Sequence, residues 1–347
     1  MSVTDILWQQ RDELIHSFHV AAINGMLDTW RRCERLGTTP QEPDFVAGLV
    51  IESTPLIHSA LNSVFAHRGI SVSMLSVFCH QTPQVAFGSH PSASCELGDV
   101  LFAYVHTPRV GQPRRNAVLF QAKASAQQPY RVQTGERHQL RLYVDWPDFI
   151  YTRASSFTGQ KRSVTPKAPH SGAQYLLIDD RPPQEPMSGL LGFPGTYPVG
   201  CCMPDENLRD HNHLASELFY LFLFRTGRPF EDRSTAAKRQ NWSQVVWDLL
   251  ETGVTKSFNR RNSGRRALPR SSGDALELLD GVSFSRASSW MSCSTAVEIV
   301  GRSAARALYA QDNSIPPDEV GGERGSDESG GGVSVVLIET SEREPEG

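Results

Sequence analysis

The sequence predicts a mixed α/β fold, with a β-sheet core flanked by helices, an extra N-terminal helix and a helical C-terminal half. Three observations predict it. Apolar residues recur at helical spacing near the N-terminus, alternating β-rich runs fill the middle of the chain, and helical apolar stretches follow them. The chain has 347 residues, which is enough for one large domain or two modest ones.

Composition and charge narrow the class of protein. Hydrophobic residues make up 39% of the chain and charged residues 21%, which is typical of a globular protein with a core. The net charge is -4 and the pI is about 6.3, so no global positive field would attract nucleic acid. Nucleic-acid binding would therefore depend on local basic patches.

The N-terminus and the cysteines indicate a cytoplasmic protein without a membrane partner. Six cysteines are few for this length, and the first twenty residues are polar and charged rather than a signal peptide. The longest apolar run, residues 218–224, is too short to span a bilayer.

The expected elements follow from periodicity and from breakers. A helix is expected over 3–34, and "GTTPQEP" (37–43) follows it as a breaker. Asp44 is expected to cap a first core helix and Ser53 or Thr54 a second, which Gly69 ends. The further elements expected are strands at 70–79, 99–106, 116–124 and 172–180, a helix starting at 136, and helices at 213–226 and 241–257.

These elements divide the chain into four parts. Residues 1–43 form an N-terminal helical segment, and residues 44–180 form the core. Residues 181–311 are expected to be mostly helical, including 275–311. Residues 312–347 read as a flexible acidic tail with one strand, 333–340, that returns to an edge of the sheet.

Polar residues gather at one end of the predicted hairpin 99–124. Side chains two residues apart on a strand share a face, so Gln121 and Lys123 point the same way and Ala122 points away. Asp99, at the start of the preceding strand, is expected to lie beside the end of the following one. A carboxylate, an amide and an ammonium should therefore converge.

This trio suits phosphodiester hydrolysis, in which a hard cation neutralises charge in the transition state. Mg²⁺ prefers oxygen ligands and usually takes one or two carboxylates. Asp99 is the expected main ligand, with the Gln121 side-chain oxygen or the Ala122 carbonyl as a weaker one. Lys123 would polarise the attacking water and stabilise negative charge. The alternative is a purely structural role, in which Lys123 is an edge-strand lysine that discourages aggregation and Asp99 only begins a strand.

"GD" before one strand and "VLFQAK" on the next resemble the PD-(D/E)xK phosphodiesterase superfamily, most closely the glutamine variant of Mrr-type restriction endonucleases. Gly98 stands where the motif has proline. The resemblance covers roughly residues 44–180 and implies a restriction endonuclease-like mixed sheet flanked by helices. It also implies a second carboxylate, for which Glu52 in the preceding helix and Glu96 are both candidates.

The same resemblance assigns a supporting role to the helix after the lysine. Gln139 and Tyr143 are four residues apart and share one helical face. They resemble the Gln-xxx-Tyr signature of some nucleases of this superfamily, which contacts substrate or supports the active site.

Basic residues provide candidate contacts to phosphates. Arg109, Arg114 and Arg115 lie in the hairpin turn, at the end far from the proposed metal, and suit tracking of a duplex. Residues 161–167 form a further basic loop. A basic, Ser-rich linker is the last candidate, and could equally be a solvated linker; its arginines are Arg260, Arg261, Arg265 and Arg266.

The sequence thus predicts a Mg²⁺- or Mn²⁺-dependent endodeoxyribonuclease. By analogy it would be an effector subunit of a bacterial restriction or anti-phage defence system, controlled by a partner ATPase, helicase or sensor subunit or by self-association. The alternative is a catalytically inactive nuclease-fold scaffold that binds nucleic acid or a partner protein. The sequence leaves open whether the substrate is DNA or RNA, which target is cut and what triggers cutting. It also leaves open whether Glu52 or Glu96 is the extra carboxylate.

Overall fold

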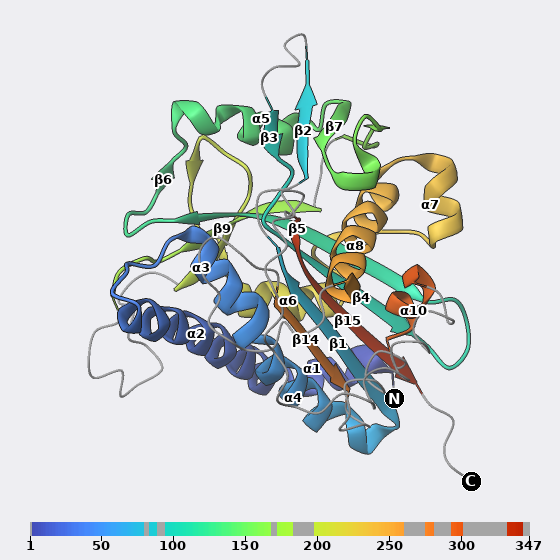
Figure 1. Cartoon of the computed structure of the whole chain (residues 1–347). Coiled ribbons are helices and arrows are strands. Elements are labelled where there is room, and N and C mark those ends of the chain that lie inside the picture. The colour runs from blue at the N-terminus through green and yellow to red at the C-terminus, as the bar shows by residue number, and fades with distance from the viewer. Residues whose placement is uncertain are drawn as a thin grey trace.

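A computed structural model describes residues 2–79, 83–88, 94–167, 172–182, 198–259, 275–280, 293–300 and 332–342. Within these ranges the chain forms one large mixed sheet with helices on both faces (Figure 1). The predicted α/β class is therefore confirmed.

The large sheet contains nine strands among the described residues. Its order is β12-β10-β9-β5-β4-β15-β1-β14, with β13 also paired to β5. Strands β4 and β15 are parallel, as are β5 and β9, and the other pairs are antiparallel. The strands are β1 (Ile70–Phe78), β4 (Val100–Thr107), β5 (Arg114–Ala124), β9 (Ala173–Ile178), β10 (Val199–Cys202), β12 (Asn212–His213), β13 (Arg228–Pro229), β14 (Ala275–Asp280) and β15 (Ser334–Glu342).

Strand β15 does not lie at an edge. It runs between β4 and β1, and it is buried from Ser334 to Thr340. The prediction of an edge strand was wrong, because pairing with two distant strands is not encoded within nine residues of sequence. The sheet is thus completed by a segment more than 200 residues after β4.

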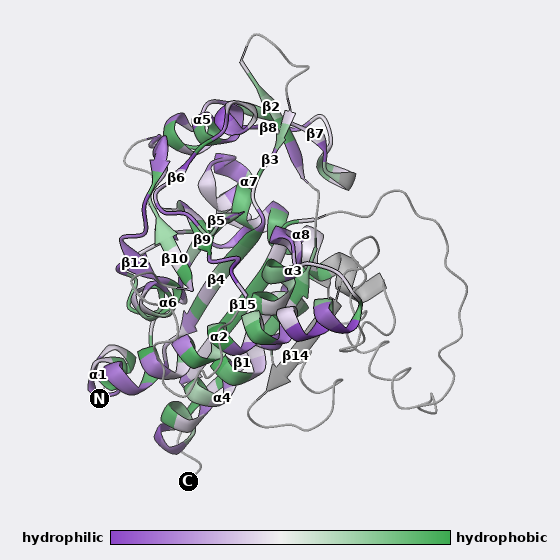
Figure 2. Ribbon diagram, turned by 90° about the vertical axis from the view of Figure 1, so that its left-hand side faces the viewer, coloured by the Kyte–Doolittle hydropathy of each residue, from purple (hydrophilic) through white to green (hydrophobic). Residues whose placement is uncertain are grey.

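Alternate residues of the strands serve two separate cores. Phe102 and Phe120 belong to the core on one face, and Leu101 and Leu119 to the core on the other. Figure 2 shows hydrophobic colouring concentrated along the central strands, whereas the helices have both hydrophobic and hydrophilic residues. This alternation explains why strands buried on both faces read as nearly continuous apolar runs.

The helices near the N-terminus and one later helix cover the first face, and the remaining helices cover the second (Figure 1). On the first face lie α1 (Val3–Gln9), α2 (Arg11–Arg35), α3 (Glu42–Ala47), η1 (Gly48–Glu52), α4 (Thr54–Phe65) and α6 (Leu214–Phe222). On the second lie α5 (Arg137–Asp145), α7 (Arg233–Arg239), α8 (Trp242–Asn259) and α10 (Ser294–Val300).

Several predicted boundaries hold and three do not. Ser53 is the N-cap of α4, and Gly69 follows η2 (Ala66–Arg68) with φ 68. The first helix breaks at Gln10, where α1 ends and α2 begins. Asp44 is not a cap but sits inside α3, where its carboxylate accepts from the Gln41 N–H at 2.9 Å. Residues 275–280, expected to be helical, form β14 because β1 offers them a partner.

Two small sheets stand beyond one end of the large sheet (Figure 1). One has the order β3-β2-β7-β8, and the other pairs β6 with β11. Between them lie α5 and the short helix η3 (Thr134–Glu136) that precedes it. Their strands are β2 (Gln84–Phe87), β3 (Ser94–Glu96), β6 (Tyr130–Arg131), β7 (Phe149–Arg153), β8 (Lys161–Arg162) and β11 (Asn207–Leu208).

No helix in the described part of the chain combines the length and the apolar character needed to cross a bilayer.

Candidate active site

Strand β5 extends past the beginning of β4. The pairing of the two strands ends at Val100 opposite Phe120, but β5 continues to Ala124 along β9. Residues 121–124 are therefore paired with a strand on one side only, so far as the described residues show. On the open side, the Ala122 N–H donates to the Asp99 carboxylate at 2.7 Å, and Ala124 provides a backbone hydrogen bond to Glu42. On this side, two carboxylates accept the backbone hydrogen bonds that a neighbouring strand would otherwise accept.

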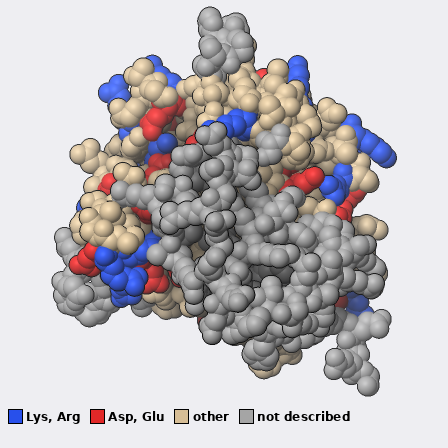
Figure 3. Space-filling model, in the orientation of Figure 1, with Lys and Arg blue, Asp and Glu red and all other residues tan. Residues whose placement is uncertain are grey.

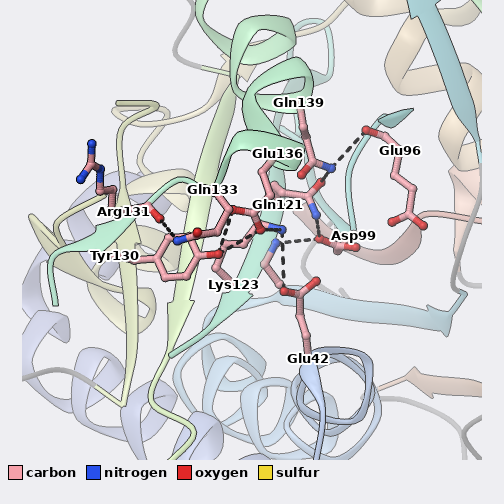
Figure 4. Close-up of polar contacts among 11 residues, drawn as sticks. Glu42, Glu96, Asp99, Gln121, Lys123, Tyr130, Arg131, Gln133, Glu136 and Gln139 are labelled. Atoms are coloured by element: carbon pink, nitrogen blue, oxygen red, sulfur yellow. Dashed lines mark hydrogen bonds and ion pairs between the residues drawn. The ribbon is translucent and has the colours of Figure 1, made fainter. Parts of the chain in front are cut away.

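The structure brings Asp99, Gln121 and Lys123 together at this overhang (Figure 4). All three are buried, at 7%, 2% and 8% exposure. The Gln121 amide NH₂ donates to the Asp99 carboxylate. Because Gln121 and Lys123 alternate with Ala122, both point to the same face of the sheet.

Lys123 lies between two carboxylates that come from different elements. Its Nζ is 3.2 Å from a carboxylate oxygen of Glu136 and 3.8 Å from one of Glu42. Glu42 begins α3, on the first face of the large sheet, and Glu136 ends η3, which lies between the two small sheets. The ammonium is therefore held from both sides.

Gln139 and Tyr143 of α5 hold the segment that leads into Asp99. The Gln139 Nε2 donates to the Gln121 Oε1 at 2.6 Å and to the Glu96 carbonyl at 3.4 Å. The Tyr143 hydroxyl donates to the Leu97 carbonyl at 2.9 Å. Both residues therefore contact the site from inside the protein, and both are buried.

Gln121 bridges two neighbours in this arrangement. Its amide oxygen, the expected weak metal ligand, accepts from Gln139, while its nitrogen donates to Asp99. To contact a cation, the amide oxygen would have to use its second lone pair or leave Gln139. The ligand role of Gln121 therefore stays a prediction.

Acidic side chains gather around the site and shift one another's pKa. Burial raises the pKa of Asp99 well above its ordinary value, and the nearby charges of Glu42 and Glu96 raise it further. Burial also raises the pKa of Glu42, against the opposing effect of Lys123. Burial would lower the pKa of Lys123, but Glu42, Asp99 and Glu136 together raise it. The ammonium is thus stabilised, and the acids repel one another.

The two candidates for the extra carboxylate lie in different places. Glu96 ends β3, and its charge acts on both Asp99 and Glu42. Glu52 ends η1, ten residues after Glu42 on one continuous helical stretch, or about 15 Å along a helix axis. The helix carboxylate at the site is therefore Glu42 rather than Glu52.

Sequence reasoning missed Glu42, Glu136 and Tyr130. Glu42 was read as part of a breaker, although a glutamate followed by proline is a common start of a helix. Glu136 could have been noticed because it precedes Gln139 by three residues and so shares its helical face. Nothing in the sequence indicates Tyr130.

The predicted phosphate-binding arginines have other surroundings. Arg114 lies over the Phe224 ring at 3.9 Å from its centroid, and Arg115 donates to the Pro113 carbonyl. Glu342 accepts from the Arg109 backbone N–H. These three lie at the far end of the hairpin from Asp99, as the register of β4 and β5 requires. The linker arginines 260, 261, 265 and 266 lie outside the described residues.

The predicted basic loop at 161–167 is not a free basic surface. Arg162 is buried against Asp248, with its Nε 2.7 Å from the carboxylate, whereas Lys161 and Lys167 both pair with the more exposed Asp148. Figure 3 shows acidic and basic side chains interspersed over the upper part of the visible face. The described surface in this view therefore has no single extended basic field.

Within the described ranges, no group of three or more His, Cys, Asp or Glu side chains is arranged closely enough to hold a metal ion. Comparison with models of protein families, with curated proteins and with solved structures gives no match. The chemistry of this site therefore has to be inferred from its own residues.

Proposed function

We propose that this protein is a metal-dependent nuclease that hydrolyses phosphodiester bonds of DNA, and that its core is restriction endonuclease-like. The observation that carries the proposal is the convergence of Asp99, Gln121 and Lys123 where β5 extends beyond β4, with Glu42 beside the lysine. Burying several ionisable groups in one place costs stability, so a chemical role explains their presence better than packing does.

The donor chemistry of the site fits Mg²⁺ or Mn²⁺. Both ions prefer hard oxygen ligands, and Mg²⁺ commonly uses one or two carboxylates with water and phosphate oxygens. Asp99 and Glu42 would hold the ion, because Asp99 is buried, Glu42 is partly buried, and the negative charge of Glu42 already acts on Asp99. When bound, the ion would neutralise charge on the phosphorane-like transition state.

The remaining residues orient the reacting groups. The Lys123 ammonium, kept charged by its carboxylate neighbours, would hold the attacking water and stabilise developing negative charge. The Ala122 N–H and the Gln121 amide fix the Asp99 carboxylate. Gln139 and Tyr143 in turn hold Gln121 and the chain before Asp99.

A cleavage assay on supercoiled and linear duplex DNA tests the proposal. The full chain is compared with Lys123→Ala, Asp99→Asn and Glu42→Gln, with Mg²⁺, with Mn²⁺ and with a chelator. We expect cutting that requires the metal and falls by at least about a hundredfold in each variant, as loss of a positioned charge-stabilising group does.

Glu52→Gln is the matched control, since it removes the other helix carboxylate without touching the site. It should cut like the unmodified chain. Cutting that survives both Lys123→Ala and Asp99→Asn would refute the proposed site. DNA binding without cutting, unchanged by Lys123→Ala, would instead support the scaffold alternative.

The cellular setting is proposed by analogy only. A nuclease subunit of this kind would act in the cytoplasm as an effector of restriction or anti-phage defence, under control of a partner subunit or of self-association. Pull-down of the full chain from cells that express its neighbouring genes would test for such a partner.

A further inference from the structure

Glu136 contacts the site from a direction that the proposed reaction does not yet account for. It is the last residue of η3, directly before α5. One of its carboxylate oxygens is 3.2 Å from the Lys123 Nζ, closer than the 3.8 Å that separates Lys123 from Glu42. Glu136 is thus the nearer of the two acids that hold the ammonium.

The position of Glu136 does not depend on Lys123. The Tyr130 hydroxyl is 2.9 Å and 2.8 Å from the two carboxylate oxygens, and the Gln133 N–H donates at 2.9 Å. Tyr130 belongs to β6, which β11 holds in place. These donors hold the Glu136 carboxylate independently of Lys123. The carboxylate can therefore determine the position of the Lys123 ammonium.

Glu136 also shares a helical face with the other supporting residues. Glu136, Gln139 and Tyr143 are spaced three and four residues apart, so they point in the same direction. Each contacts a different part of the site: Lys123, the Gln121 amide and the Leu97 carbonyl. One helical segment therefore contacts both the lysine and the strand end that bears Asp99.

We propose that Glu136 is a positioning residue that aims the Lys123 ammonium, with Tyr130 as its anchor. The catalytic meaning of this inference rests on the proposed nuclease function. A lysine side chain has a flexible four-carbon stem and much rotamer freedom, which the ion pair restricts. Glu42 alone would leave the ammonium tethered from one side, and small misplacements of a reacting group lower rates strongly.

The first test needs no activity. The side-chain ammonium of a held lysine gives a ¹H–¹⁵N NMR signal, because its protons exchange slowly with water; Lys123→Arg identifies the signal by removing it. We expect the signal in the unmodified chain, its loss in Glu136→Gln and a weaker signal in Tyr130→Phe. Glu206→Gln is the matched control, since Glu206 is an exposed acid beside β6 whose carbonyl accepts from Val132.

The second test uses cleavage kinetics. Glu136→Gln should lower kcat by about tenfold or more with KM nearly unchanged, because the residue orients Lys123 without touching DNA. Tyr130→Phe should lie between Glu136→Gln and the unmodified chain. In a Lys123→Ala background, Glu136→Gln should change the residual rate by less than about twofold.

The outcomes separate this inference from the proposed function. If the unmodified chain does not cut DNA, the NMR signal still decides whether Glu136 holds Lys123. Absence of the Lys123 signal from the unmodified chain, or its persistence in both Glu136→Gln and Tyr130→Phe, would overturn the inference. So would a fall in kcat on Glu136→Gln that is equally large without Lys123.

Discussion

The Gln139 side chain donates to the Gln121 amide oxygen at 2.6 Å, and both side chains are buried. This contact joins α5 to the strand that bears the lysine. Since Gln121 also donates to Asp99, the orientation of the Asp99 carboxylate depends on a helix that follows it by about forty residues.

Replacing Gln139 by leucine should therefore destabilise the fold and impair the site together. The Gln121 oxygen would lose its donor in a buried place, which costs about 1–3 kcal/mol in the free energy of unfolding. Chemical denaturation measures this loss. Gln127→Leu, at an exposed position, is the control, and an equal effect of the two substitutions would contradict the assignment.

Gly98→Ala should disturb the approach to Asp99. A Cβ at Gly98 would lie 2.7 Å from the Leu119 Cδ1 and 2.8 Å from the Tyr143 Oη, so both contacts would have to be relieved by movement. We expect a loss of about 1–3 kcal/mol in unfolding free energy. Gly135→Ala meets nothing within 4 Å and should leave stability nearly unchanged. Equal stability of the two variants would show that the contact with Tyr143 is not tight.

The buried Glu339 should make stability depend on pH. Burial raises the pKa of Glu339, although Ser294 and Thr295 at the start of α10 donate to it at 2.6 Å and 2.8 Å. A folded pKa above the unfolded value of about 4.3 gives stability that is present below that value and is lost as pH rises through the folded pKa.

The unfolding free energy of the unmodified chain relative to Glu339→Gln should thus fall as pH rises above the unfolded pKa of about 4.3. Denaturation at a series of pH values measures the difference. Glu298→Gln, an exposed position on the same helix, should show no such trend. A difference that grows with pH would contradict the expected direction.

Asp248→Ala should be among the most damaging single changes. Asp248 is 1% exposed and accepts from Arg162, Tyr151 and Gln244. Its removal leaves the buried Arg162 charge without a partner, which costs about 3–5 kcal/mol. Thermal denaturation measures the loss. Asp148→Ala removes ion pairs to exposed lysines and a hydrogen bond from the Ser163 hydroxyl, and should cost about 1–2 kcal/mol. Equal costs of the two changes would argue against a tight buried pair.

The local features of this protein, such as which side chains share a face of a strand or helix, could be predicted from sequence. The residues that determine them lie within a few positions of one another. The two-residue period of a strand puts Gln121 and Lys123 on one face, and a turn of the right length makes 99–124 a hairpin. The four-residue spacing of Gln139 and Tyr143 similarly puts both on the side of α5 that meets the site.

What the tertiary structure alone decided are the contacts between segments far apart in the chain. It brought Glu42 rather than Glu52 to Lys123, and Tyr130 to Glu136. It also inserted β15 between β1 and β4, and it turned Arg162 inward to Asp248. Periodicity specifies which face a residue occupies, but the partner on that face is chosen by packing of the whole chain, which no single stretch of sequence encodes.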